Sequence, residues 1–260
     1  MTTTDLVLTY LGGPTVLIEL GGLRMLTDPT LDPAGTSYPT AAYTLHKTAG
    51  PAIDPGTLGH LDAILLSHDH HFDNLDNAGR ALLDRANRVL TTEAGASRLG
   101  GRAIGLAPWQ EIDLPAPNGQ TVKVTATPAR HGPPDGDRGP VVGFVLATPD
   151  DSGGAVYVSG DTVWFEGVAA VGERFSVKIA LLFMGAARVA VAGPSHLTLT
   201  AEEGVTAARA FPDAVIVPVH FEGWAHFSEG RTEVARAFAA AGLTSRLRWL
   251  EPGRPTRLPL

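Results

Sequence analysis

Four β-rich segments of this sequence each run directly into a histidine or an aspartate. They read AILLSHDHH (63–71), VTATPARHG (124–132), AVYVSGDT (155–162) and AVIVPVH (214–220). The carboxyl ends of strands meet at one edge of a sheet, so side chains that are distant in the sequence can meet there. The chain is therefore expected to fold around β-sheets that gather imidazoles and carboxylates at one edge.

The remaining pattern predicts strands early in the chain and alternating strands and helices later. Glycine pairs separate the first three short runs, which is typical of hairpins because glycine accepts positive φ. A helix is expected from Leu75, with its N-cap at Asp73 or Asn74. The segments expected to be strands are 5–11, 15–20, 23–28, 63–67, 88–91, 120–128, 140–149, 155–160, 213–220 and 246–253, those expected to be later helices are 200–211 and 232–242, and 29–60 is expected to be a long loop.

This order of elements predicts an α/β (α+β) fold. A series of β-runs followed by a helix occurs twice along the chain, which indicates two sheets packed face to face with helices on the outer faces. At 260 residues the chain is long enough for one large domain or two small ones. We expect a single domain over residues 1–260.

Composition limits the partners and the chemistry. The net charge is −7 and no basic stripe is present, which argues against nucleic acid as a partner. There is no cysteine, so a metal would be held by histidine nitrogen and carboxylate oxygen. The amino terminus lacks a secretory pattern, and Arg188 interrupts the longest apolar stretch. We therefore expect no membrane span and a cytoplasmic protein.

The residues at the strand ends suit a divalent metal. Neutral imidazoles and carboxylates bind Zn²⁺ and related ions, and such an ion lowers the pKa of a coordinated water. His131 alone would be read as an ordinary surface histidine, as His46 and His60 are. Taken together, His68, His131, Asp161 and His220 predict a metal site.

At these residues the chain resembles the metallo-β-lactamase superfamily. The resemblance is closest to metal-dependent hydrolases that include the L-ascorbate-6-phosphate lactonase-like and N-acyl phosphatidylethanolamine phospholipase D-like branches. It covers nearly the whole chain and implies a four-layer αββα sandwich of two mixed sheets, with one or two metals at the sheet edge. The matching positions are Thr27-Asp28-Pro29, the T/S-H-x-H-x-D-H motif at 67–74, His131, Asp161 and His220.

The motif at 67–74 fits in two registers. From the left, Ser67-His68-Asp69-His70 matches, but Phe72 and Asp73 then replace the aspartate and the third histidine. From the right, Asp73 and Asp76 match, Asn74 replaces the last histidine, and Asp69 and His71 take the two earlier histidine positions. One extra residue reconciles the registers. The following helix favours the right-hand register for His71 and Asp73, His68 stays a candidate ligand or a neighbour of the ligands, and alternation points His70 outward.

The resemblance also implies a division of ligands between two metals. One metal takes two motif histidines and the third-motif histidine, the other takes the motif aspartate, the last motif histidine and the late histidine, and the aspartate of the GDT motif bridges them. Asn74 is a weaker zinc ligand than imidazole, so the second site should be weakened or should favour Mn²⁺ over Zn²⁺. Our hypothesis assigns the tighter metal to His71, His131 and Asp161 with His68 or Asp69, and the weaker one to Asp73 and His220, which could instead position the water. Asp28 is expected to brace the site by hydrogen bonds.

Two further segments carry histidines near the expected site. His196 precedes a helix whose start, Thr200 to Glu203, has the pattern of a capping box, so His196 either reaches the site or is incidental to the cap. His226 follows Trp224, and this aromatic loop either walls a pocket or packs as core. Arg130 either meets an anionic group or forms a surface ion pair.

These residues predict a metal-dependent hydrolase. A metal-bound hydroxide would attack a small ester, lactone, amide or phosphodiester, with Asp73 orienting or deprotonating the water. Asp73, His196 and His226 are the candidate catalytic residues. Because the motif is altered, a relative that binds metal or ligand without turnover is the alternative, and a di-iron redox protein is a third class.

Overall fold

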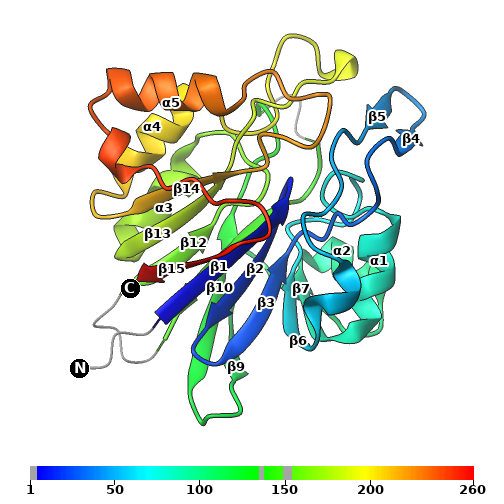
Figure 1. Cartoon of the computed structure of the whole chain (residues 1–260), viewed down its shortest axis with the longest axis vertical. Helices are drawn as coiled ribbons and strands as arrows, with labels where there is room; N and C mark the ends of the chain where they lie inside the picture. The colour runs from blue at the N-terminus through cyan, green and yellow to red at the C-terminus, as the bar shows by residue number, and fades with distance from the viewer. Residues whose placement is uncertain (1–4, 135–137, 149–153) are drawn as a thin grey trace.

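Two β-sheets pack face to face at the centre of the computed structural model, which describes residues 5–134, 138–148 and 154–260 (Figure 1). Leu20 pairs with Leu23 across Gly21 and Gly22, which both have positive φ, as a two-residue hairpin turn of type I′ requires. The first sheet has seven strands, in the order β15 (Pro255–Pro259), β1 (Asp5–Gly12), β2 (Thr15–Leu20), β3 (Leu23–Thr27), β6 (Leu61–Leu65), β7 (Ala86–Thr91) and β8 (Ala103–Gly105).

The second sheet is also mixed. Its strands run antiparallel from β9 to β12 and parallel from β12 to β14, as the first sheet is parallel from β3 to β8. The six strands lie in the order β14 (Val215–Val219), β13 (Val177–Phe183), β12 (Ala155–Val158), β11 (Val142–Ala147), β10 (Thr121–Pro128) and β9 (Glu111–Pro115).

Helices cover the outer face of each sheet. The short helices α1 (Asn77–Leu82) and α2 (Glu93–Leu99) lie against the first sheet (Figure 1). The second sheet packs against α3 (Glu166–Arg174), α4 (Ala201–Ala210) and α5 (Arg231–Ala240). A central core, with Ile18 and Phe144 among its members, fills the space between the sheets. The predicted αββα sandwich is therefore confirmed. Within the described ranges, we find no helix with both the length and the apolarity that crossing a membrane requires.

Several local predictions differ from the structure. The first helix is capped by Asp76, whose carboxylate accepts a hydrogen bond from the Gly79 amide at 2.8 Å, rather than by Asp73 or Asn74. Segment 246–253 is not a strand: it makes one bridge, from Leu247 to Ile216, and the Arg246 guanidinium donates to the carbonyls of Ala208 in α4 and of Ala214 just before β14.

The loop expected over 29–60 contains a small hairpin, β4 (Ser37–Pro39) and β5 (Thr44–His46), and a 3₁₀ turn at Pro55–Leu58. Each strand of the hairpin has three residues and the 3₁₀ turn has four, so these elements are too short for a periodic pattern to show in the sequence. Two predictions fall partly outside the described residues. They concern residues 1–4, in the amino terminus where we expect no secretory pattern, and residue 149, the last of the expected strand 140–149.

Gly79 is required where α1 meets the chain after β3. A Cβ atom at this position would lie 1.8 Å from the Pro29 carbonyl oxygen. We expect Gly79→Ala to lower the free energy of unfolding by about 1–3 kcal/mol, although alanine favours helix by about 1 kcal/mol. Urea unfolding followed by circular dichroism measures this. Gly230→Ala is the control, because its new methyl group meets nothing nearer than 3.6 Å. An equal or higher midpoint for Gly79→Ala would contradict the packing argument.

Candidate metal centre

Loops at one edge of both sheets carry the candidate ligands. His68 follows β6, and His131, Asp161 and His220 follow β10, β12 and β14. Strands β10, β12 and β14 run in the same direction, so their carboxyl ends share an edge. All four side chains are buried. The structure thus brings together residues up to 152 positions apart, counted from 68 to 220.

Three imidazoles form the first group. The Nε2 atom of His68 lies 3.0 Å from Nδ1 of His71, and Nε2 of His131 lies 3.1 Å from the same atom. The Oδ2 atom of Asp161 lies 3.5 Å from Nε2 of His131. A single nitrogen can carry one proton at most, so His71 cannot satisfy both neighbouring nitrogens through hydrogen bonds. A cation between the three rings would satisfy all of them.

Hydrogen bonds around the ligands fix two of the tautomers. The Ser67 hydroxyl donates to Oδ1 of Asp28 at 2.8 Å, so its oxygen accepts from Nδ1 of His68 at 2.9 Å. Likewise Nδ1 of His131 donates to the Leu197 carbonyl at 2.8 Å. In the neutral ring each Nε2 is then the nitrogen without a proton, and its lone pair faces the group, which is the form that binds a metal. Asp28 is thus linked to His68 through the Ser67 hydroxyl.

A second group lies beside the first and shares Asp161 with it. Its Oδ1 atom is 3.4 Å from Nε2 of His220, which is 3.6 Å from Oδ2 of Asp73. Ligand atoms about 2.0–2.1 Å from a tetrahedral Zn²⁺ are about 3.3 Å apart, close to these separations. Both Asp161 oxygens and both His220 nitrogens are buried without a hydrogen-bond partner in the part of the chain that the structure describes. The donor set therefore fits a divalent metal.

The charges of these groups are strongly coupled. Burial lowers the pKa of His71 to about 3, with the neighbouring His131 adding to the effect. Burial disfavours protonated His220, but the Asp161 and Asp73 carboxylates outweigh it and raise its pKa to about 10. Burial also opposes the charge on Asp73, yet His220 and His226 hold its pKa well below the usual range. The first group thus offers imidazole nitrogens, and the second sets a protonated His220 between two ionised carboxylates, so a metal ion there would displace the His220 proton.

Asp69 does not join either group. Its Oδ2 atom accepts a hydrogen bond from Nε of Arg98 at 2.9 Å, and a second guanidinium nitrogen binds Oδ1. Burial opposes the charge on Asp69, but Arg98 outweighs it and lowers its pKa. Arg80 donates to the Asp69 carbonyl as well, at 2.9 Å. These contacts tie the histidine loop to α1 and α2 through Asp69, and they leave His68 nearer than Asp69 to the other candidate ligands.

The other predicted residues fall around the centre. Asn74 is fully buried, and its amide atoms have no hydrogen-bond partner among the residues described. His70 is exposed and lies 2.9 Å from the Arg138 carbonyl, and its ring also forms a group of possible ligands with His68 and His71. His196 pairs with Glu203 at 3.0 Å, within the capping box of α4, and belongs to no ligand group among the residues described. His226 lies 3.1 Å from Asp73.

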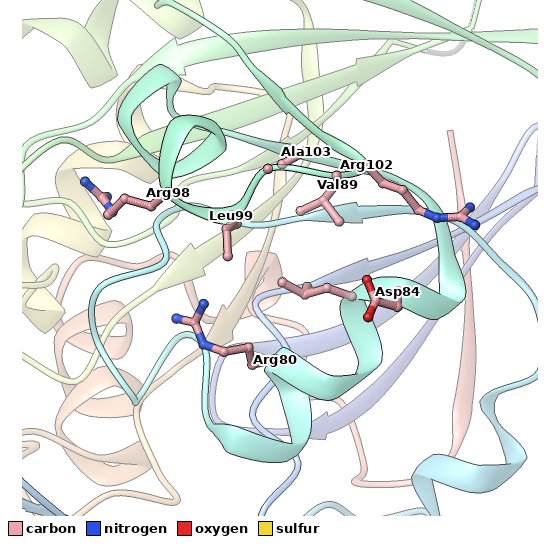
Figure 2. Close-up of a pocket in the computed structure, with 10 residues that line it drawn as sticks. Arg80, Asp84, Val89, Arg98, Leu99, Arg102 and Ala103 are labelled. Carbon is pink, nitrogen blue, oxygen red and sulfur yellow. The ribbon is translucent and has the colours of Figure 1, made fainter.

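Two arginines beside the centre escaped the sequence analysis. Arg80 and Arg98 line a hollow of about 290 Å³ together with His71 and Phe72. The same two side chains reach into a neighbouring hollow of about 270 Å³, shown in Figure 2, where they point to one side and Arg102 to the other. They stand on separate short helices, so no run of basic residues marks them in the sequence.

A sandwich of two mixed sheets, with histidines and aspartates for a divalent metal at one edge, describes a class of metal-binding proteins to which metal-dependent hydrolases belong. Residues 23–221 match the Beta-lactamase superfamily domain, and the chain belongs to the metallo-β-lactamase superfamily. A UPF0173 metal-dependent hydrolase of Caldivirga maquilingensis is 26% identical over 97% of this chain and 98% of its own. A second, from Pyrobaculum aerophilum, is 26% identical over 82% of each.

Solved structures share the fold. The isothiocyanate hydrolase from Delia radicum gut bacteria superposes with a TM-score of 0.82 at 21% identity, covering 98% of this chain and 100% of its own. A possible metal-dependent hydrolase from Veillonella parvula gives 0.80 at 18% identity, covering 99% and 100%. The family resemblance and the enzyme class expected from the sequence are confirmed, and the branch stays a prediction.

The Asp28–Ser67–His68 chain should support metal affinity. We expect Ser67→Ala to weaken binding of the tighter ion by about 10–100-fold while the fold is kept, because His68 loses the group that fixes its tautomer. Competition with a chromophoric chelator measures the affinity. Ser97→Ala is the control, since the Ser97 hydroxyl binds only the Glu93 carbonyl within its own helix. Unchanged affinity in Ser67→Ala would refute this role.

The role of Asp69 can be separated from that of a ligand. If Asp69 acts through Arg98, then Asp69→Asn and Arg98→Gln should each weaken metal binding by about tenfold, and the double variant should be no worse than either. Equilibrium dialysis against Zn²⁺ measures all three. If Asp69→Asn loses an ion that Arg98→Gln retains, Asp69 is a ligand after all.

Proposed function

We propose that the protein hydrolyses a small ester, lactone, amide or phosphodiester at this centre. One observation carries the proposal: the Asp161 carboxylate is divided between two ligand groups, with Oδ2 toward His131 and Oδ1 toward His220. A carboxylate placed this way can bridge two ions or hold one ion beside a reacting water. No protein nucleophile is needed for either arrangement.

The two groups suit different ions. His68, His71 and His131 offer nitrogen, which favours Zn²⁺, and with Asp161 they make four donors. Asp73 and His220 share Asp161 in the second group, a mixed set that admits Zn²⁺ or Mn²⁺. A divalent ion supplies two things when bound: a water of lowered pKa and a Lewis acid for the substrate oxygen.

Asp73 is placed to orient the attacking water. Its carboxylate is buried, it lies 3.6 Å from His220 and 3.1 Å from His226, and its low pKa keeps it ionised. An ionised carboxylate accepts a hydrogen bond from water and aims its lone pair, whereas so weak a base removes a proton poorly near neutral pH. Asp73 therefore contributes orientation more than proton abstraction.

The surroundings favour a small substrate with an anionic part. The hollow that His71 borders is about 290 Å³, at the lower end of the range for small-molecule sites. Arg98 is half exposed there and already paired with Asp69, so Arg80 adds a positive charge that the Asp69 carboxylate does not offset. Arg130 lines a second hollow of about 200 Å³ with Trp164 and His196.

Metal-loaded protein should be screened against paired substrates. Each pair has the same lactone, ester, amide or phosphodiester group, with and without a carboxylate substituent, and an isothiocyanate is included because a protein of the same fold hydrolyses one. We expect turnover of the anionic member. Asp73→Asn should lower kcat/KM by about 10²–10⁴-fold with the fold intact, whereas Asp113→Asn, on the exposed face of β9, should not.

The same screen tests the alternative. Wild-type protein that holds its metal but turns over nothing in the panel would contradict hydrolysis of this substrate class and favour a binding protein. Equal rates for the anionic and the neutral substrate of a pair would contradict the proposal that the positive charge of Arg80 favours an anionic substrate.

A further inference from the structure

The second ligand group lacks one histidine that the family motif places at position 74. Asn74 occupies that position, its side chain is fully buried, and neither amide atom has a partner among the described residues. An amide oxygen binds zinc far more weakly than imidazole. With Asp73, Asp161 and His220 alone, the second group has three donors, one of which it shares with the first group.

A histidine from another loop reaches this group. The Nε2 atom of His226 lies 3.1 Å from Oδ2 of Asp73, which is 3.6 Å from Nε2 of His220. Both separations are close to the about 3.3 Å between neighbouring ligand atoms of a tetrahedral zinc ion. The His226 side chain is only 10% exposed, so its ring is held near the carboxylate in the protein interior.

The backbone around His226 is fixed from both sides. The Arg188 amide donates to the His226 carbonyl at 2.9 Å, and the Ala225 amide donates to the His46 carbonyl at 3.0 Å. The ring packs against Phe227, with centroids 4.6 Å apart. The loop between β14 and α5, orange in Figure 1, is thus tied both to the β4–β5 hairpin and to the segment after β13. A ligand needs such a rigid seat.

We propose that His226 replaces the missing motif histidine and completes a second divalent-metal site with Asp73, Asp161 and His220. The inference rests on the metal centre of the proposed function and adds a ligand from a different part of the chain. It means that the loss of imidazole at position 74 does not reduce the protein to one ion. The loop that carries Trp224 is then part of the metal centre, not only of its wall.

A plain ion pair between His226 and Asp73 is the competing explanation. His196 and Glu203 provide the comparison, because that pair has nearly the same separation, 3.0 Å, but Glu203 belongs to no ligand group that the described residues form, whereas Asp73 does. If pairing with Asp73 were the whole role of His226, its loss could weaken the second ion by about 10–100-fold through Asp73, but the ion would not be bonded to His226, and replacing His196 would leave metal binding unchanged.

Metal counting shows whether His226 supports the second ion, and the distance of that ion from Nε2 of His226 shows whether His226 does so as a ligand. Metal-free wild type, His226→Ala, His226→Gln and His196→Ala are dialysed against a fixed concentration of free Zn²⁺ and the bound ions are counted. We expect two ions per chain in wild type and His196→Ala, and one in both His226 variants, with second-site affinity reduced at least tenfold. In Co²⁺-loaded protein, the visible bands of the second ion should be lost from the His226 variants while those of the first remain.

Two ions bound with wild-type affinity in the His226 variants would overturn the inference while leaving the metal centre in place. Uptake of no ion by wild type would instead contradict the proposed function itself. Crystals of wild type grown with Zn²⁺ give a test that needs no variant to fold. An anomalous peak about 2.0–2.1 Å from Nε2 of His226 supports the assignment. A second-site peak bonded to Asp73, Asp161 and His220 but more than about 3 Å from His226 refutes it.

Discussion

The architecture depends on one buried carboxylate, that of Asp161. The side chain is completely buried, and neither oxygen finds a hydrogen-bond donor within the described ranges. Burying such a charge is costly unless a cation compensates it. His131 and His220 flank it, protonated His220 compensates part of its charge, and a divalent ion on each side would supply that charge in its place. The other polar groups of the centre are arranged around this requirement.

The scaffold gathers the groups around Asp161 by bringing the two sheets close together at one edge. Gly160, just before Asp161, has φ of +59°, and a Cβ atom there would lie 2.7 Å from the Val142 carbonyl and 2.8 Å from Cβ of Ser67. Ser67 belongs to the loop after β6 in the first sheet, and Gly160 to the loop after β12 in the second. The close approach places His68 and Asp161 in one ligand group, which a bulkier residue at 160 would push apart.

Whether the sequence could predict a feature depends on how far apart along the chain the interacting residues lie. The sequence could predict that His131, Asp161 and His220 lie together because each stands just after its own strand, and the strand pattern is local. Asp69 could not be placed, because the partner that draws it away, Arg98, lies 29 residues on in a helix of seven residues. For the same reason the sequence analysis did not predict α2 and α3. It also placed the first helix cap at Asp73 or Asn74 and not at Asp76, whose carboxylate also binds Lys47, just after β5. Side-chain alternation predicts that His70 points outward, but it does not predict that Nδ1 of His71 lies 3.0 Å from His68 and 3.1 Å from His131.

Backbone strain at the centre shows which parts are set by the scaffold. His220 has φ of +54° and Asp28 of +23°, a region that costs non-glycine residues about 1–2 kcal/mol. Hydrogen bonds from other segments hold both: the His220 amide donates to the Gly13 carbonyl at 2.8 Å, and the Asp28 amide donates to the Leu65 carbonyl at 3.1 Å. Packing of the sandwich therefore imposes these conformations, and a divalent ion meets ligands already in position. Strain that persists only because its surroundings enforce it is common at functional sites, and here it falls on the late histidine and on the aspartate that braces the first group.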